Sequence, residues 1–122
     1  MISTGWVGVD LDGTLAEYHY GDLHQFGMLY VGPPIMPMVT RVKTWIELGE
    51  TVKIFTARVA HPNEEDRANI LTAIEQWCLA HIGQILEITN MKDYQMRVLY
   101  DDRAVQVEAN TGRLIGEDRT YV

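Results

Sequence analysis

Short apolar runs that end in polar residues divide this chain into regular units. Four of these runs have the length that is typical of buried strands. They cover about residues 6–10, 51–55, 85–89 and 97–100. Gly13 breaks the chain soon after the first run, and polar, turn-forming stretches follow the others. The pattern therefore predicts four short strands, each followed by a loop.

In two of the intervals between these runs, apolar residues recur with the spacing of one helix face, which predicts a helix in each. The first predicted helix covers about residues 36–48 and ends before Gly49. The second covers about residues 64–81, with Asn63 as its N-cap. Each helix then has one apolar face. These faces consist of Val39, Val42 and Ile46 in the first helix and of Ile70, Ile74, Trp77 and Cys78 in the second.

Two further segments have the composition of turns and hairpins. Residues 16–34 combine glycines and prolines with aromatic residues, and we interpret them as a β-hairpin flap. Near the end of the chain, residues 105–108 and 113–115 flank Asn110-Thr111-Gly112, which predicts a second hairpin. The alternation of strands and helices elsewhere favours an α/β fold with a mainly parallel sheet and helices on both faces.

Composition limits the class of protein. The 122 residues suit one domain, residues 1–122, and 47% of them are hydrophobic. No apolar stretch approaches the roughly 20 residues of a membrane span, and the first residues lack the pattern of a signal peptide. A single cysteine, Cys78, excludes an internal disulfide. We therefore expect a cytoplasmic protein without a membrane partner.

Charge limits the class of partner. The net charge is −7, with only 10 lysines and arginines, so a broad basic face for duplex nucleic acid is not expected. A small phosphorylated substrate, or the end of a nucleic acid, suits this charge better than a long polymer.

The most informative chemistry follows the first strand. Asp10 and Asp12 are two residues apart, so in an extended chain their side chains share one face. They lie where a strand ends, which is the edge at which open α/β sheets bind ligands. Two uncompensated carboxylates repel each other there. A divalent cation relieves this repulsion, and Mg²⁺ is the usual one at phosphate sites.

Three later motifs follow the other predicted strands in order. Thr56-Ala57-Arg58 follows the second, Lys92 follows the third, and Asp101-Asp102 follows the fourth. Together with Asp10-Leu11-Asp12, this series resembles the four motifs of the haloacid dehalogenase (HAD) superfamily of phosphotransferases. The motifs extend over about three quarters of the chain. A kinase of the P-loop type and a dinucleotide-binding dehydrogenase are excluded, because their glycine-rich motifs are absent.

The resemblance implies a fold and a size class. It implies a three-layer Rossmann-like sandwich with the first strand at the centre. Additional cap domains of this superfamily would be inserted after the first acidic motif or between Thr56 and Lys92. Neither interval has room for one, so the chain is expected to be a member without a cap domain and with an open site.

The resemblance also implies catalytic roles. Asp10 would attack the phosphorus atom as the nucleophile and form an aspartyl-phosphate. Asp12 would act as general acid and then as general base. Mg²⁺ would be held by Asp10, the carbonyl of Asp12 and Asp101, with Asp102 as a direct or water-mediated ligand. Thr14 is expected to tie the turn after the acidic motif.

Phosphate binding is assigned by the same comparison. Thr56 and the backbone near it, at Ala57, would donate hydrogen bonds to the phosphoryl oxygens, and Lys92 would neutralise negative charge. Alternatives remain open for each of these residues. The hydroxyl of Thr56 also suits a helix cap, and Arg97 is a second candidate for the cation. Arg58 and Arg103 each suit either a site carboxylate or a second substrate phosphate.

The substrate is indicated by a shorter likeness. Asp101-Asp102-Arg103, followed by Val105-Gln106-Val107, is similar to the fourth motif in the phosphatase domain of polynucleotide kinase-phosphatases. We therefore expect a Mg²⁺-dependent phosphomonoester hydrolase acting on a nucleotide or a nucleic-acid end phosphate. The alternative is a non-catalytic HAD-fold protein that binds phosphate or a partner.

Overall fold

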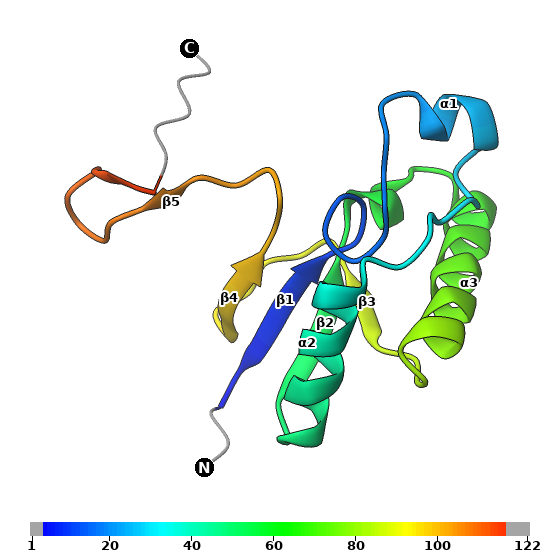
Figure 1. The fold of residues 1–122 in the computed structure, drawn as a ribbon. Coiled ribbons are helices and arrows are strands. Elements are labelled where there is room, and N and C mark those ends of the chain that lie inside the picture. Colours follow the sequence, from blue (N-terminus) through cyan, green and yellow to red (C-terminus); the bar gives the residue numbers. More distant parts are fainter. Residues whose placement is uncertain (1–3, 117–122) are drawn as a thin grey trace.

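A parallel sheet of four strands is the centre of the fold in the computed structural model, which describes residues 4–116. The strand order is β3-β2-β1-β4, so β1 has a neighbour on each side (Figure 1). This confirms the predicted α/β fold with a mainly parallel sheet. The strands are β1 (Trp6–Asp10), β2 (Thr51–Phe55), β3 (Glu87–Thr89) and β4 (Met96–Tyr100).

The register of the strands brings their carboxyl ends to one edge. Asp10 pairs with Phe55 of β2, and Val9 pairs with Tyr100 of β4. The residues that follow β2 and β4 therefore start beside Asp10. This edge is where the predicted motif residues were expected to meet.

Two long helices confirm the predicted helical segments. They are α2 (Met36–Glu47) and α3 (Glu64–His81). The predicted N-cap is present, because the side-chain oxygen of Asn63 accepts a hydrogen bond from the Asp66 N–H at 2.9 Å. A short 3₁₀ helix, η1 (Ala57–Ala60), lies between β2 and α3.

Both long helices contribute to a single buried cluster on one face of the sheet. Val7 and Val9 of β1 belong to the same cluster as Val42 of α2 and Ile74 of α3. The connections from β1 to β2 and from β2 to β3 run in the same direction across the sheet. Right-handed connections then place both helices on the same side. The described residues therefore do not confirm the predicted three-layer sandwich.

The opposite face is covered by the connection from β3 to β4, which contains no helix. Residues 90–95 are too few for a helical crossover, which needs about a dozen residues. The Trp6 side chain, 3% exposed, donates its indole N–H to the Asp93 carboxylate at 2.9 Å. The ammonium of Lys53 lies 4.6 Å from the centre of the same indole. On this face of the sheet, residues 90–95 and the Trp6 side chain therefore occupy the place that a helix would take in a three-layer sandwich.

The predicted β-hairpin flap is not confirmed. Residues 16–34 contain the short helix α1 (Asp22–Phe26) where paired strands were expected. An isolated bridge between Ala16 and Pro34 closes the base of the segment. The indole N–H of Trp77 in α3 donates to the Gly32 carbonyl at 2.8 Å. The alternation of apolar residues that defines a hairpin is interrupted by Gly21 and Gly27, which have φ angles of 93° and 85° and flank α1.

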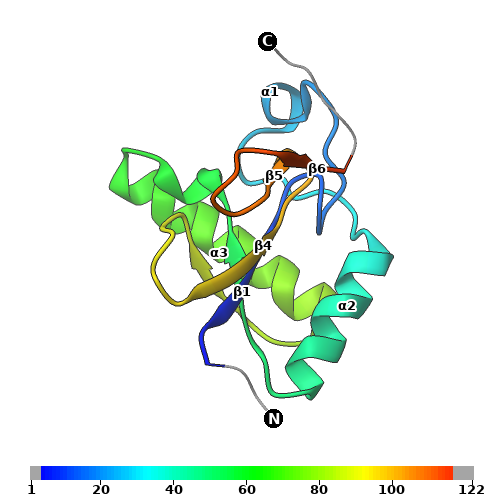
Figure 2. The same ribbon diagram turned by 90° about the vertical axis from the view of Figure 1, so that its left-hand side faces the viewer.

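The predicted terminal hairpin is present. Strands β5 (Gln106–Val107) and β6 (Leu114–Ile115) pair in antiparallel orientation. They are shorter than predicted, and the hairpin extends beyond β4, away from α2 and α3 (Figure 1). Figure 2, which looks from that side, shows the hairpin in front of the upper end of the sheet. No helix within residues 4–116 has the length and apolar character that crossing a membrane requires.

Candidate active site

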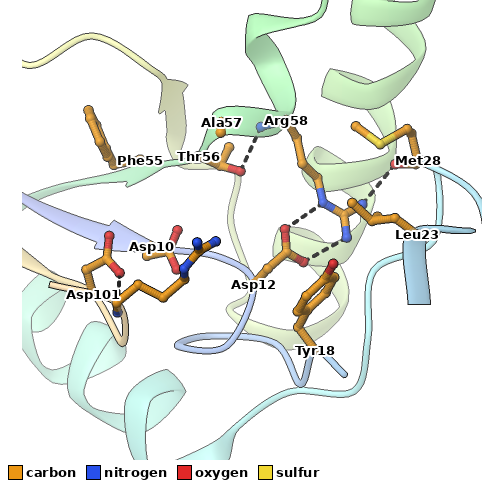
Figure 3. Close-up of a pocket in the computed structure, with 11 residues that line it drawn as sticks. Asp10, Asp12, Tyr18, Leu23, Met28, Phe55, Thr56, Ala57, Arg58 and Asp101 are labelled. Atoms are coloured by element: carbon orange, nitrogen blue, oxygen red, sulfur yellow. Dashed lines mark hydrogen bonds and ion pairs between the residues drawn. The ribbon is translucent and has the colours of Figure 1, made fainter. Parts of the chain in front are cut away.

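Acidic and hydroxyl side chains from three strand ends line one pocket at the carboxyl edge of the sheet. The pocket has a volume of about 510 Å³ and is open to solvent. Asp10 ends β1, Thr56 follows β2, and Asp101 follows β4. Figure 3 shows these side chains around the pocket, with Asp12 and Arg58 beside them. The parallel register thus brings together residues that are up to 91 positions apart in the chain.

Asp10, Asp101 and Asp102 form a cluster of carboxylates. One oxygen from each lies within 4.8 Å of the others. Burial, together with the charges of Asp101, Asp102 and Asp12 and a hydrogen bond to Asp102, raises the pKa of Asp10 to about 8. A carboxylic acid in such surroundings resists ionisation. The cluster is therefore a place where a cation would be strongly stabilising.

The tight turn after β1 holds Asp102 in this cluster. Gly13 has a φ of 87°, and a Cβ atom built there would lie 2.8 Å from the Asp102 Cγ. The Thr14 hydroxyl donates to the Asp102 carboxylate at 3.1 Å and accepts from the Asp102 main-chain N–H at 3.1 Å. Thr14 therefore has the structural role predicted for it in the turn, and its partner, which the sequence did not indicate, is Asp102 in the loop after β4.

The donor set suits a hard divalent cation. Carboxylate oxygens are the ligands that Mg²⁺ and Ca²⁺ prefer, and the cluster offers three of them from Asp10, Asp101 and Asp102. The described pocket lining contains no histidine or cysteine, the ligands that zinc favours. The cluster could hold a metal ion, and the side chain of Asp12 is not part of it.

Asp12 instead forms an ion pair with Arg58. The Arg58 Nε donates to one oxygen of Asp12 at 2.8 Å, and Nη2 donates to the other at 2.7 Å (Figure 3). The guanidinium also donates through Nη1 to the carbonyls of Met28 and Tyr30, at 2.8 and 2.6 Å. Arg58 is 4% exposed. The sequence left two roles open for Arg58, and the structure shows one of them, the pairing with a site carboxylate, which is that of Asp12.

Of the two roles that the sequence left open for Thr56, the structure shows the cap, and the residue also lines the pocket. Its hydroxyl oxygen accepts a hydrogen bond from the Arg58 main-chain N–H at 3.2 Å, which caps η1. The residue is only 2% exposed, yet it lines the pocket together with Ala57. Its main-chain N–H donates to the Thr89 carbonyl, so the loop is fixed to β3. Among residues 4–116 the Thr56 hydroxyl acts as an acceptor only, which leaves its proton available for donation.

The two candidate cations for the phosphoryl group lie outside the pocket lining. Lys92 is exposed on the connection from β3 to β4. Arg97 forms an ion pair with Glu50, next to the start of β2 and therefore at the opposite end of the sheet from Asp10. Arg103, by contrast, lines the pocket. The structure thus brings together the acids and Thr56 but not Lys92.

Part of the pocket lining was not predicted from the sequence. Leu23 and Met28, from the segment that contains α1, form one wall together with Tyr18. Phe55, the last residue of β2, lies on the sheet side. Of the aromatic residues in 16–34, only Tyr18 lines the pocket, so their concentration was a weak signal for this wall. Nothing local indicates that Leu23 and Met28 turn toward the acids.

The comparisons with known proteins concern the fold. No family model and no curated protein matches this chain. A solved structure of a conserved protein coded by a locus of Bacteroides thetaiotaomicron is similar, with a TM-score of 0.55 and 19% identity. The similarity covers 84% of this chain and 78% of that chain. It supports the α/β arrangement and carries no information on chemistry.

Proposed function

We propose that this protein is a Mg²⁺-dependent phosphomonoester hydrolase of the HAD type that acts through an aspartyl-phosphate. The observation that carries the proposal is the cluster of Asp10, Asp101 and Asp102, because Asp10 and Asp101 line the same pocket as Thr56. A phosphate monoester is a dianion, so its catalyst must bring charge compensation and a positioned nucleophile to the same point. The pocket combines an acidic cation site, a nucleophile candidate and a hydroxyl donor.

The proposed reaction has two steps. In the first, a carboxylate oxygen of Asp10 attacks phosphorus and the bond from phosphorus to the leaving oxygen breaks, while Asp12, which has to enter this step in its protonated form, gives that proton to the leaving oxygen. In the second, Asp12 takes a proton from a water molecule that attacks the phosphorus, which frees Asp10 and releases phosphate. Asp10 must be ionised to attack. Bound Mg²⁺ would supply the positive charge that favours this form and would offset the charge of the phosphoryl group.

Donors around the phosphoryl group are proposed from the adjacent loop. Thr56 would donate its hydroxyl proton, and the N–H groups near Ala57 would donate to the phosphoryl oxygens. Lys92 remains the proposed cation, and it would have to extend from its exposed position toward Asp10. Arg103 is a second cation, which already lines the pocket.

A nucleotide or a nucleic-acid end phosphate is the proposed substrate class. The wall formed by Tyr18, Leu23 and Met28 offers an apolar and aromatic surface next to the acids. A volume of about 510 Å³ falls within the range of small-molecule sites. An apolar wall suits a leaving group with a flat base better than a bare sugar, which would require polar partners.

A substrate screen tests this proposal. Purified protein is incubated with phosphomonoesters, with and without Mg²⁺, and released phosphate is measured. The panel includes nucleoside monophosphates, 3′-phosphorylated oligonucleotides, sugar phosphates and p-nitrophenyl phosphate. We expect Mg²⁺-dependent release, fastest with nucleotides or oligonucleotide ends. Chelator should abolish it.

Asp10→Asn is the matched variant for this screen. It preserves the shape of the side chain and removes the attacking charge. We expect it to lose more than nine-tenths of turnover, which corresponds to more than about 1.4 kcal/mol in the barrier. Retained turnover would exclude Asp10 as the nucleophile. If the wild type hydrolyses nothing but is stabilised by beryllofluoride and Mg²⁺, the protein binds phosphate without catalysis.

A further inference from the structure

A buried arginine links the proposed acid/base residue to the wall of the pocket. Arg58 directs two donors at the carboxylate of Asp12 and a third at the carbonyls of Met28 and Tyr30. The two carbonyls belong to residues 17–33, here called the wall segment. These four hydrogen bonds are 2.6 to 2.8 Å long, and Arg58 is 4% exposed.

The planarity of the guanidinium makes this link rigid. The donors Nε, Nη1 and Nη2 are fixed relative to one another in one plane and form a fork. The guanidinium therefore cannot change its orientation toward Asp12 without also changing its orientation toward the wall segment. Both oxygens of Asp12 accept from Arg58, which sets the orientation of the Asp12 carboxylate. The carbonyls of Met28 and Tyr30 in turn set the position of Arg58. A displacement of the wall segment would therefore move the oxygens of Asp12.

The wall segment is also the part of the pocket that would meet the leaving group. Tyr18, Leu23 and Met28 all line the pocket, and Met28 additionally offers its carbonyl to Arg58. The ends of the segment are fixed by other contacts, namely the bridge from Ala16 to Pro34 and the bond from Trp77 to Gly32. The middle of the segment, which contains Met28 and Tyr30, is thus the part that is connected to Asp12 through the hydrogen bonds of Arg58.

We propose that Arg58 is a positioning residue that couples the wall segment to Asp12. Contact of the leaving group with the wall then sets the orientation in which Asp12 meets the leaving oxygen. The catalytic consequence rests on the proposed function, whereas the coupling itself does not. Because coupling between two sites is reciprocal, a change at Asp12 must also alter the wall segment.

Hydrogen–deuterium exchange tests the coupling without any substrate. Amides of the wall segment, such as those of Gln25, Gly27 and Tyr30, donate hydrogen bonds within the segment. In Arg58→Lys, which keeps the charge and loses the fork, we expect these amides to exchange at least tenfold faster. In Asp12→Asn we expect a smaller change in the same direction. Amides of α2 should exchange at the wild-type rate in both variants.

Arg67→Lys is the matched control. Arg67 also donates a guanidinium hydrogen bond to a backbone carbonyl, that of His61, but it lies outside the pocket lining. It should leave exchange of the wall segment unchanged. If Arg58→Lys does not fold, the Asp12→Asn variant alone tests the coupling. It keeps Arg58, and asparagine has nearly the same shape as the aspartate that it replaces. Wild-type exchange of the wall segment in Asp12→Asn would overturn the coupling.

A comparison of leaving groups tests the catalytic consequence. The kcat of each variant is measured with a nucleoside monophosphate, whose alkoxide needs a proton, and with p-nitrophenyl phosphate, whose leaving group scarcely does. We expect Arg58→Lys to lose at least tenfold more kcat on the first substrate, as Asp12→Asn should. The double variant should lose no more than Asp12→Asn alone, because both changes remove one function.

The outcomes separate this inference from the proposed function. Equal losses on both substrates in Arg58→Lys would mean that Arg58 is structural only, and would overturn its positioning role. If the wild type hydrolyses neither substrate, the proposed function fails, and the exchange experiment still decides whether Arg58 couples the wall segment to Asp12.

Discussion

Asp10 is the residue on which the charge balance of the pocket depends. It is partly buried, and two other carboxylates lie within 4.8 Å of it. Its pKa is raised to about 8, from an ordinary value of 3.8, first by burial and then by Asp101 and Asp102. A nucleophile has to be ionised near neutral pH, so the same surroundings that hold a cation oppose the ionisation of Asp10 without one.

The raised pKa predicts a pH dependence of stability in chelator. Between pH 4 and 8 the folded protein retains a proton on Asp10 that the unfolded chain has released. Stability therefore falls as pH rises through this range. Asp10→Asn lacks this contribution, so its stability relative to wild type should improve from pH 5 to pH 8 by on the order of 1 kcal/mol after allowance for solvent screening. Urea denaturation at both pH values measures it.

Mg²⁺ provides the internal control for this experiment. By favouring the ionised form of Asp10, it should reduce the pH dependence of the wild type and leave the variant almost unaffected. A stability difference between variant and wild type that does not change with pH would contradict the assignment of a raised pKa to Asp10.

Gly13 allows a second test at the residue scale. Gly13 and Gly83 both have positive φ, 87° and 98°, so alanine at either position costs roughly 1–2 kcal/mol. Only at Gly13 would the new Cβ also meet Asp102, since nothing lies within 4 Å of a Cβ at Gly83. We expect the rise in melting temperature caused by Mg²⁺ to be lost in Gly13→Ala and kept in Gly83→Ala. An equal rise in both would exclude Asp102 from the cation site.

At the scale of elements, α3 serves as a support for the pocket. Its residues Ile70, Ile74 and Cys78 belong to the buried cluster, and Trp77 fixes the wall segment through Gly32. The helix starts at a defined point, because Asn63 caps it and three acidic residues occupy its first turn. Acidic residues there also interact favourably with the helix dipole.

The cap of α3 leads to a stability prediction. Asn63→Ala removes the acceptor of the Asp66 N–H and should destabilise the protein by about 1 kcal/mol, a fall of a few degrees in melting temperature. Asn69→Ala is the control, because Asn69 is exposed in the interior of the same helix, where alanine is favourable. Thermal denaturation of both variants distinguishes capping from a general effect of losing asparagine. Equal melting temperatures would contradict the capping role.

At the scale of the whole molecule, cation binding and folding are linked. The three carboxylates come from the ends of β1 and β4, so the cluster exists only when the sheet is formed. An ion that binds only the folded state stabilises it, by about 2.7 kcal/mol at one hundred times its dissociation constant. The net charge of −7 adds a general screening effect, which has to be separated from binding.

This linkage predicts a melting temperature that rises with Mg²⁺ concentration at constant ionic strength. Asp101→Ala should remove most of the rise, because it deletes one of the clustered carboxylates. Glu65→Ala removes an equal charge from an exposed position on α3 and should preserve the rise. Thermal denaturation over a series of Mg²⁺ concentrations measures all three proteins. An identical rise in Asp101→Ala would show that the cation acts elsewhere.

Elements whose signals are local could be predicted from the sequence. Apolar runs and helical spacing predicted the four sheet strands and both long helices, and Asn63 was identified as a cap. The order of the strand ends also predicted that Asp10, Thr56 and Asp101 would meet. These predictions succeeded because period, capping and strand direction are properties of neighbouring residues.

Only the tertiary structure decided how these elements face one another. The position of both long helices on one face of the sheet follows from the direction of the connections and from a β3–β4 crossover too short for a helix. Arg58 and Asp12 are 46 residues apart, and their pairing depends on where η1 and the turn after β1 meet. The exposed position of Lys92 and the inward position of Met28 likewise depend on the complete fold. Which side chains that are distant in sequence pair with each other depends on packing and charge across the whole molecule, so it cannot be predicted from a local sequence pattern.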